Sequence, residues 1–245
     1  MHEPLKGADR LTLLEELHKQ YAKASTWQQR WTLWRKRWAW YLVVRSARAI
    51  KRLTDILIAS AALIILSPLF LVIALLIKFS DWGPIFYVST RVGKWGREFP
   101  FPKFRSMKIQ ADQEKKELMK QNIHQSVGTF KMKKDPRTTW IGKWIRRASI
   151  DELPQLWSVI LGHMSLVGPR PPLPEEVATY TLKDRRRLDV RPGITCIWQI
   201  SGRSDIPFDK QAELDKEYIE SRSLLLDLTI LVKTIPAVIM GKGAY

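Results

Sequence analysis

The chain has 245 residues, which is enough for one large domain with an appendage. It carries 41 lysines and arginines against 24 aspartates and glutamates, and the net charge of +17 indicates a polyanionic partner such as nucleic acid, anionic lipid or a phosphorylated substrate. The single cysteine, Cys196, excludes an intrachain disulfide, and the mixed-charge N-terminus lacks the apolar run of a secretory signal.

The N-terminal segment is expected to form amphipathic helices, one of which carries a stripe of tryptophans. Residues 9–23 have the leucine spacing of a short helix, and the next helix places four indoles at intervals of four, three and four residues: Trp27, Trp31, Trp34 and Trp38. Its basic residues stand mostly at other positions. Because Trp favours membrane interfaces, this pattern favours a helix lying among anionic lipid headgroups. Packing of the indoles against the protein itself is the alternative.

Residues 56–77 form an uncharged apolar run of 22 residues, long enough to cross a bilayer. Ser67 and Pro68 stand at its centre, where a proline kinks or breaks a helix. Basic residues flank both ends, and the positive-inside rule would place both ends in the cytoplasm. This favours a re-entrant hairpin whose two arms rise roughly 16 and 13 Å, about one leaflet each. A single kinked span is the alternative.

The rest of the sequence indicates a helical domain with little β-structure. Residues 83–107 alternate glycines, prolines and aromatic residues, which predicts a short β-hairpin or a loop structure. Residues 223–240 fit an interfacial or core helix. We therefore predict an α-dominated α+β fold: a single membrane-associated domain with a re-entrant, Ser-Pro-broken membrane helix hairpin, a small β-hairpin and interfacial amphipathic helices. The expected division is a Trp-rich interfacial extension (1–50), the re-entrant membrane helix (51–80) and a cytoplasmic catalytic domain (81–245).

Two adjacent carboxylates, Asp151 and Glu152, precede an apolar segment in the stretch SIDELPQLWSVILGHMSLVGPRPP. Ser149 and Glu152 have the spacing of a helix capping box, which would explain Glu152 without any catalysis. Pro154 complicates this interpretation, because the helix can instead begin at that proline. These residues alone leave structural capping and catalysis equally open.

Cations close to the acidic pair favour a phosphate site. Arg146 lies five residues before Asp151, beside Arg147 and Lys143, and guanidinium groups near a helix terminus bind phosphate. A bound phosphate would repel the two acids unless covalent chemistry or a metal is involved. A carboxylate can attack phosphorus as a nucleophile, and its neighbour can hold Mg²⁺ together with phosphate oxygens.

Several motifs, in the same order along the chain, resemble those of the bacterial polyprenyl-phosphate sugar-1-phosphate transferases, also called monotopic phosphoglycosyl transferases. A set of long ordered motifs is very specific. The resemblance covers about residues 50–245 and is carried by SIDELPQLWSVILGHMSLVGPRP, KRLTDILIA with the Ser67-Pro68 break, KFRSMK (103–108), DPR (135–137), RPGIT (191–195), WQISGR (198–203) and LDKEY (214–218).

The resemblance implies an initiating transferase of the bacterial inner membrane, with its catalytic domain facing the cytoplasm. Such an enzyme moves a sugar-1-phosphate from a UDP-sugar to undecaprenyl phosphate and releases UMP. Formation of undecaprenyl-diphosphate-sugar by this reaction is the first membrane step of polysaccharide or glycoconjugate synthesis. The family pattern assigns Asp151 as the nucleophile that forms an aspartyl-phosphosugar intermediate and Glu152 as the ligand of Mg²⁺.

Four arginines are candidates for phosphate or donor binding, and the resemblance assigns two of them. Arg146 matches the family arginine that binds phosphate, and Arg170 matches the arginine implicated in donor binding. Arg147 is a neighbour of Arg146 and is expected to add to the phosphate site. Arg203 is a further candidate, although a structural ion pair is an equally open role for it.

Some questions stay open at the level of sequence. Cys196 stands where the family usually has a glycine, and it would strain the backbone if that position requires a positive φ angle. A membrane-bound scaffold or binding homologue without turnover is the alternative function, although the intact Asp151, Glu152 and Arg146 favour an enzyme. The apolar run argues against a nucleic-acid partner, and a homodimer is left open. The donor sugar cannot be read from residues that act on phosphate.

Overall fold

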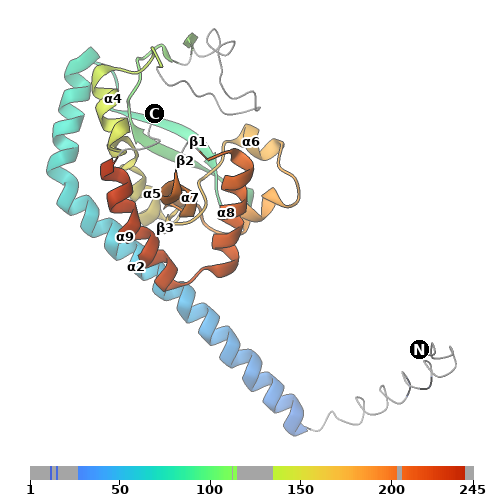
Figure 1. The fold of residues 1–245 in the computed structure, drawn as a ribbon. Helices are drawn as coiled ribbons and strands as arrows, with labels where there is room; N and C mark the ends of the chain where they lie inside the picture. Colours follow the sequence, from blue (N-terminus) through green and yellow to red (C-terminus); the bar gives the residue numbers. More distant parts are fainter. Residues whose placement is uncertain are drawn as a thin grey trace. The chain divides into compact units, whose positions relative to one another are not determined.

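Most of the described chain is helical (Figure 1). The protein is represented by a computed structural model, which describes residues 12, 15, 27–111, 113–114, 135–202 and 206–240; Arg203 and most of the helix expected over 9–23 lie outside them. Two compact units divide the chain, Met1–Lys51 and Arg52–Tyr245. The elements are α2 (Trp27–Asp81), β1 (Phe86–Val92), η1 (Lys94–Gly96), β2 (Glu98–Phe104), α4 (Trp140–Arg147), η3 (Ile150–Glu152), α5 (Gln155–Leu161), β3 (Ser165–Val167), α6 (Pro174–Ala178), η4 (Asp184–Asp189), β4 (Gly193–Thr195), α7 (Ile197–Ser201), α8 (Phe208–Ser221) and α9 (Leu224–Met240).

The 55-residue helix α2 runs through the predicted break without unwinding. Pro68 lacks the N–H that would bond to the carbonyl of Ile64, and the hydroxyl of Ser67 donates to that carbonyl instead, at 2.8 Å. The Ser-Pro pair therefore keeps the backbone polar groups satisfied, and Figure 1 shows the Arg52–Asp81 part of α2 curving along the larger unit. The predicted interruption is a proline inside one helix, and the re-entrant path stays a prediction.

The end of α2 has an identifiable cause. Trp82 adopts a left-handed conformation with φ of 56°, which stops helix propagation. The carboxylate of Asp81 accepts from the backbone N–H of Gly83 at 3.2 Å, and Lys78 donates to the carbonyl of Trp82 at 3.0 Å. The chain then turns directly into the β-hairpin.

The hairpin predicted within residues 83–107 is confirmed by β1 and β2, which pair antiparallel from Phe86 opposite Phe104 to Val92 opposite Glu98. The turn contains Trp95 and Gly96 at positive φ. Pro100 and Pro102 in β2 have no N–H to donate, which limits pairing with a further strand, and among the described residues this sheet has two strands.

A second, parallel sheet joins β3 to β4 and fixes the segment that carries Arg170. Gly168 donates to the carbonyl of Thr195 at 3.0 Å, and Gly193 donates to that of Pro169 at 2.9 Å. A Cβ atom on Gly193 would lie 2.1 Å from the nitrogen of Gly168, so only glycine allows the two backbones to approach this closely. The GPRP and RPGIT motifs are thus two sides of one backbone contact.

Two hydrophobic clusters hold the larger unit together. The first lies among α2, β2, α5, β3, α8 and α9 and includes Ala59, Phe99, Phe101, Leu156, Val159, Met164, Val167, Tyr218 and Ile230. The second joins the C-terminal part of α2 to β2 and α4 through Ile73, Ile77, Phe104, Ile141 and Ile145. Burial of each large side chain contributes roughly 1.5–3 kcal/mol. The Arg52–Asp81 part of α2 is therefore a core element of this unit.

Polar contacts also fix α2 to the elements around the site. Arg52 donates to the carbonyls of Val159 and Ile160 in the last turn of α5, at 2.6 and 2.8 Å. Cations are favourable there because the last carbonyls of a helix lack backbone partners. Asp55 accepts from the hydroxyl of Ser165 at 2.8 Å and from the N–H of Leu166 at 3.2 Å. One turn of α2 thus joins α5 to β3.

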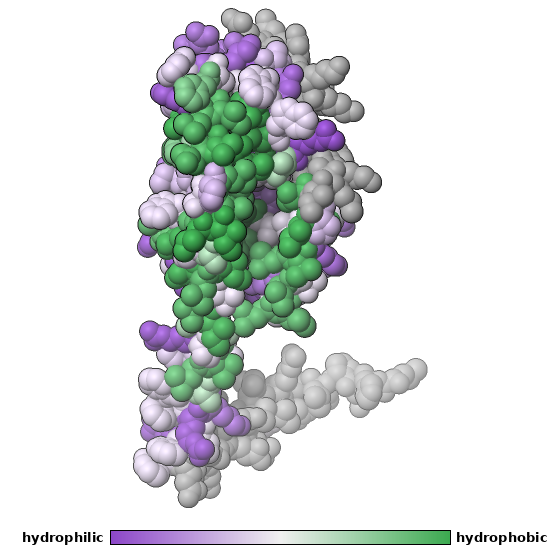
Figure 2. All heavy atoms as spheres, turned by 90° about the vertical axis from the view of Figure 1, so that its left-hand side faces the viewer, coloured by the Kyte–Doolittle hydropathy of each residue, from purple (hydrophilic) through white to green (hydrophobic). Residues whose placement is uncertain are grey.

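Large apolar side chains are exposed on the surface of this unit. Figure 2 shows them gathered on the side where α2 lies. They include Leu53, Leu57, Ile64, Ile65, Leu71, Val72, Leu75 and Phe79 of α2 and Leu225, Leu228, Val232 and Ile235 of α9. Within the described residues, α2 is the one helix long and apolar enough to cross a membrane by length and composition. Exposed apolar area of this extent marks a membrane or partner surface.

Candidate active site

Asp151 and Glu152 lie on the short turn η3, between α4 and α5. Ser149 enters η3 in a left-handed conformation with φ of 54°, and its side chain makes no capping bond. The capping-box interpretation is therefore wrong: a Ser N-cap needs an extended backbone, and the carboxylate of Glu152 pairs elsewhere. Helix α5 begins one residue after Pro154, as that proline suggested. Neither carboxylate caps a helix. Glu152 pairs with Lys103 of the hairpin, and the charge of Lys103 also affects Asp151.

Asp151 is buried, with 7% of its surface exposed. The pKa of its carboxyl is raised from 3.8 to about 6, because burial and, to a smaller extent, the negative charge of Glu152 outweigh the opposing charges of Lys103 and Arg146. At neutral pH the group is ionised but poorly solvated. A carboxylate in this condition has fewer waters to lose when it attacks an electrophile, which suits a nucleophile.

Glu152 has a fixed partner, because its Oε1 accepts from Nζ of Lys103 at 2.6 Å. Burial acts to raise the pKa of this carboxyl, but Lys103, Arg170 and Arg91 outweigh burial and lower the pKa to about 2. The pKa values of the two neighbouring acids are therefore shifted in opposite directions. Glu152 stays ionised under all ordinary conditions, while Asp151 titrates near the physiological range.

The hairpin supplies two of the cations around the acids. Arg91 and Lys103 flank the ring of Phe101, with their cationic groups 5.2 and 5.3 Å from its centroid. The register places Arg91 opposite Phe99 and Lys103 two residues beyond Phe101, so all of these side chains leave the same face of the sheet. We call Arg91, Phe101 and Lys103 the hairpin cluster.

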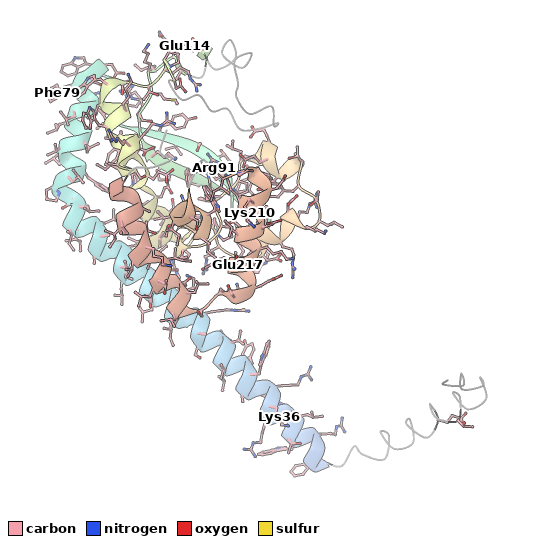
Figure 3. All side chains as sticks on the ribbon, in the orientation of Figure 1. Lys36, Phe79, Arg91, Glu114, Lys210 and Glu217 are labelled. Carbon is pink, nitrogen blue, oxygen red and sulfur yellow. The ribbon has the colours of Figure 1, made fainter. Side chains whose placement is uncertain are left out.

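Arg91 and Arg170 bring two guanidinium groups close together. Arg91 donates to the carbonyl of Pro171 at 3.2 Å, directly after Arg170, and its Nε is buried without a hydrogen-bond partner among the described residues. Burial, followed by the charge of Arg170, lowers the pKa of Arg91 to about 10. Figure 3 labels Arg91 near the centre of the larger unit. Two repelling guanidiniums and an unused donor are the features of a site for an anion.

The structure brings some of the predicted site residues together and leaves others apart. The charge of Arg146 acts to lower the pKa of Asp151, and the guanidinium donates to the hydroxyl of Thr138 at 3.3 Å. The charge of Arg170 lowers the pKa of Glu152. Arg147, by contrast, is exposed, and its side chain makes no polar contact within the described part of the chain. Arg203 lies in the segment 203–205, outside the described residues.

Other motif residues have structural roles. In the DPR motif, Asp135 accepts from Nε and Nη2 of Arg137 at 2.9 and 2.6 Å, and this buried pair shapes the approach to α4. Arg105 of KFRSMK pairs with Asp81 at the end of α2. Arg191 donates to the carbonyl of Gly162 at 3.0 Å. These contacts explain the motifs through folding, without a role in binding.

The suspected strain at Cys196 is absent. Its φ of −153° is ordinary extended backbone, so the position does not require glycine, and the buried thiol donates to the side-chain oxygen of Gln199 at 3.3 Å. The condition under which Cys196 would strain the backbone, a positive φ angle, is therefore not met. Its side chain fills a fully buried position before α7.

Sequence analysis did not identify Lys103, Arg91 or Gln155 as site residues. The first two were noted only as basic residues, although their period-two spacing with Phe99 and Phe101 was a usable signal for one sheet face. Gln155, one helical turn after Asp151, is 1% exposed, and its Nε2 donor has no partner among the described residues. Nothing in its sequence context distinguished it from an ordinary helix residue.

The acidic pair fits a magnesium ion that is held partly by substrate phosphates. No group of three or more His, Cys, Asp or Glu side chains in the described part of the chain could hold a metal through the protein alone. Mg²⁺ commonly binds through one or two carboxylates plus phosphate oxygens, and the ionised, half-buried Glu152 beside Asp151 is such a donor set. When bound, the metal would neutralise phosphate charge.

Comparison with known proteins agrees with this arrangement. The family model described as bacterial sugar transferase matches residues 46–241. The chain is 46% identical over 198 residues to the exopolysaccharide production protein ExoY of Sinorhizobium fredii, covering 80% of this chain and 88% of the relative. It is 41% identical over 207 residues to the undecaprenyl-phosphate galactose phosphotransferase of Salmonella typhimurium, covering 83% of this chain and 43% of the relative.

A third relative is the UDP-glucose:undecaprenyl-phosphate glucose-1-phosphate transferase of Escherichia coli, 35% identical over 210 residues, with 81% of this chain and 42% of the relative covered. The chain thus spans less than half the length of the last two relatives and most of the length of ExoY. The chain belongs to the bacterial sugar transferase family, and it is a transferase.

Proposed function

We propose that this enzyme moves a sugar-1-phosphate from a UDP-sugar to undecaprenyl phosphate through a covalent intermediate on Asp151, and so begins a polysaccharide or glycoconjugate. The observation that carries the proposal is the divergence of the acidic pair. Asp151 has a raised pKa of about 6, and Glu152 beside it is held ionised by Lys103. Two adjacent acids with opposite shifts are typical of divided catalytic roles.

The chemistry balances in two displacements. A carboxylate oxygen of Asp151 attacks the phosphorus that bears the sugar, and the bond from that phosphorus to the bridging oxygen breaks. The bridging oxygen leaves with the electron pair as part of UMP, and the sugar phosphate stays on Asp151. A phosphate oxygen of undecaprenyl phosphate then attacks the same phosphorus, and Asp151 departs as a carboxylate. Neither displacement requires the enzyme to move a proton.

The cations hold the donor for this displacement. Arg146, which acts on the field at Asp151, is the proposed ligand of the reacting phosphate, and Arg170 with Arg91 forms a second anion site for the donor's diphosphate. Lys103 orients Glu152 and lowers the pKa of both acids. We retain Arg147 and Arg203 as proposed outer phosphate contacts, with exposed Arg147 able to reach phosphate only at the edge of the site.

The membrane arrangement belongs to the same proposal. Both ends of the apolar run are basic, and the re-entrant path proposed for α2, with Pro68 at its middle, would return the chain to the face by which it entered. The catalytic unit would then lie on the cytoplasmic face of the inner membrane, where UDP-sugars are made. The exposed apolar side chains of α2 and α9 support this placement, because they would meet acyl chains instead of water.

The test is the appearance of UMP and of a protein adduct before any lipid acceptor is added. Wild-type enzyme incubated with a panel of UDP-sugars is expected to release UMP in a burst stoichiometric with protein and to gain the mass of one sugar phosphate. Asp151→Asn should abolish both while donor binding survives, and the exposed control Asp209→Asn should preserve both. An active Asp151→Asn enzyme, or an adduct on another residue, would contradict the assignment.

The stability of the same variant separates catalysis from a structural role. The pKa of Asp151 is higher in the folded chain than its ordinary value of 3.8, so its ionisation opposes folding as the pH rises from about 4 to 6, and the penalty is complete above pH 6. Asp151→Asn removes a buried charge, so Tm at neutral pH should rise or stay constant. A fall of Tm would indicate that Asp151 serves the fold.

The alternative of a membrane scaffold without turnover is tested by the same panel. If no UDP-sugar yields UMP in the presence of undecaprenyl phosphate and Mg²⁺, while donor binding remains, the scaffold hypothesis gains. The buried, high-pKa Asp151 disfavours it, because a scaffold has no use for a destabilising buried charge.

A further inference from the structure

The N-terminal part of α2 has a surface that the transferase chemistry does not use. Residues 27–48, which we call the Trp helix, lie in the unit Met1–Lys51 and almost entirely before residue 46, where the family match begins. Its aromatic side chains are exposed despite their size: Trp27 77%, Trp31 49%, Trp34 54%, Trp38 47%, Trp40 68% and Tyr41 45%. Exposure of this many large rings marks a binding surface.

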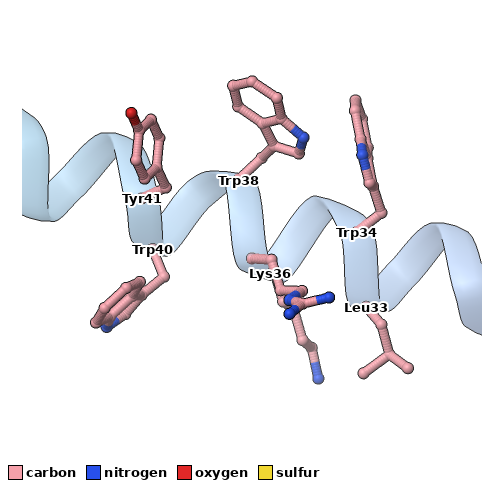
Figure 4. Close-up of a pocket in the computed structure, with 7 residues that line it drawn as sticks. Leu33, Trp34, Lys36, Trp38, Trp40 and Tyr41 are labelled. Atoms are coloured by element: carbon pink, nitrogen blue, oxygen red, sulfur yellow. The ribbon is translucent and has the colours of Figure 1, made fainter.

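The rings form a continuous ladder along one side of the helix. Ring centroids are 6.4 Å apart between Trp31 and Trp34, 5.5 Å between Trp34 and Trp38, and 5.9 Å between Trp38 and Tyr41. Figure 4 shows Trp34, Trp38 and Tyr41 leaving the helix on the same side, opposite Lys36. Such contacts hold the rings in a fixed array without burying them.

The charge of the Trp helix has a single sign. No acidic residue occurs between residues 27 and 54, and the helix carries six cations: Arg30, Arg35, Lys36, Arg37, Arg45 and Arg48. Two guanidiniums lie over the ladder itself, Arg35 at 5.6 Å from the ring of Trp31 and Arg45 at 5.5 Å from that of Tyr41. At about 100° per residue, Arg30 and Arg37 fall on one flank of the ladder and Arg35 on the other.

We propose that the Trp helix is a binding site for anionic phospholipid headgroups, with the indoles at the membrane interface and the flanking cations on lipid phosphates. Trp and Tyr favour this depth of a bilayer, and each cation near an anionic surface adds attraction. The apolar run begins at Ile56, eight residues along the chain after Arg48, so the Trp helix precedes at short range the segment that we expect to enter the bilayer.

The positive charge of the Trp helix favours an anionic lipid surface over a second copy of the protein as the partner. A second copy of the Trp helix would bring six more cations against these six, which disfavours self-association on this surface. An anionic phosphate surface instead attracts the six cations of the Trp helix. The inference does not depend on the proposed reaction, because the Trp helix contains none of the residues assigned to it.

The test compares hydrogen exchange of full-length protein in nanodiscs of phosphatidylcholine alone and of phosphatidylcholine mixed with phosphatidylglycerol. Peptides covering residues 27–48 should exchange more slowly in the anionic discs, by about tenfold or more, because three or more cations engage the surface. The combined variant Arg35→Gln, Lys36→Gln, Arg37→Gln should lose most of this difference. Peptides from α5 should exchange equally in both lipids, which checks that the larger unit is intact.

The ladder is tested with lipids brominated near the headgroup, which quench nearby indoles. Replacement of Trp31, Trp34 and Trp38 by leucine should remove a large part of the quenching, whereas the charge variant should reduce it only in anionic discs. Equal exchange of residues 27–48 in the two lipids would overturn the proposal. So would protection that survives in the charge variant, or protection that appears only when two protein copies share one disc.

Discussion

Two of the clusters in which cations lie over aromatic rings, the hairpin cluster and the Trp helix, differ in one respect. In the hairpin cluster, Arg91 and Lys103 stand 5.2 and 5.3 Å from Phe101. In the Trp helix, Arg35 and Arg45 stand 5.6 and 5.5 Å from Trp31 and Tyr41. The local geometry is nearly the same. The hairpin cluster, however, is partly buried against an acid, Glu152, whereas the Trp helix is exposed and has no acid within its own sequence.

The difference decides how each cation works. Removal of a half-buried cation with one acidic partner has a large effect by itself, because the carboxylate left behind is poorly solvated and has no counter-ion. An exposed cation among five others acts as a member of a set, since solvent screens each one and the polyanion sees their sum. We therefore expect single substitutions to have large effects in the hairpin cluster and small effects in the Trp helix.

The largest effect in this comparison is expected for Lys103→Met. The substitution leaves Glu152 without its 2.6 Å partner and removes a charge that lowers the pKa of both acids, so turnover should fall by about 100-fold or more. Because Asp151 must be ionised to attack, wild-type activity should decline as the pH falls through about 6. In the variant this decline should begin at a higher pH, and the pH profile of UMP release measures it.

Lys210→Met is the matched control for this variant. Lys210 also pairs with a glutamate, Glu213, at 3.0 Å, but both side chains are exposed, and Figure 3 labels Lys210 on α8. Its loss should leave turnover and the pH profile unchanged, since an exposed pair contributes little. Equal effects of the two substitutions would mean that burial does not distinguish these lysines.

An intermediate effect is expected for Arg91→Lys, which keeps the charge but removes Nε and the planar fork. If Arg91 holds the donor's diphosphate together with Arg170, KM for the UDP-sugar should rise about tenfold with a smaller change in kcat. Arg186→Lys, at an exposed pair 3.3 Å from Glu220, should change neither constant. A fall in kcat with KM unchanged would instead place Arg91 at the transferred phosphate.

The smallest effect is expected for Arg35→Gln. One exposed cation of six should change turnover by less than about twofold and weaken attraction to an anionic membrane by about 1 kcal/mol. Turnover in nanodiscs with and without phosphatidylglycerol measures both consequences. Abolished activity would show that Arg35 contacts the reaction, and the contrast between the two clusters would then fail.

These clusters also show what sequence can and cannot predict. The alternation of glycines, prolines and aromatic residues predicted the hairpin, and motif order predicted the family, because both depend on neighbours along the chain. The pairing of Lys103 with Glu152 joins residues 49 positions apart, and no local pattern specifies it. The closeness of Arg91 to Arg170 likewise depends on how the hairpin packs beside the β3–β4 sheet.

One local rule misled because a tertiary contact replaced a local one. The spacing of Ser149 and Glu152 fits a capping box, but Lys103 pairs with the carboxylate and Ser149 is left-handed. The Ser67-Pro68 pair is a different case, because the hydroxyl of Ser67 bonds to the Ile64 carbonyl of the same helix, which Pro68 cannot reach with an N–H. The helix therefore continues through this pair, and the re-entrant path stays a prediction.

The contacts of Arg52 and Asp55 impose an order on biosynthesis. Their partners in the finished fold, the Val159 carbonyl and Ser165, lie 107 and 110 residues further along the chain. At typical rates of synthesis these partners emerge on the order of ten seconds after the helix itself. Until α5 and β3 have been synthesised, the partners of Arg52 and Asp55 do not exist, so this turn of α2 can be fixed in place only after both elements have emerged.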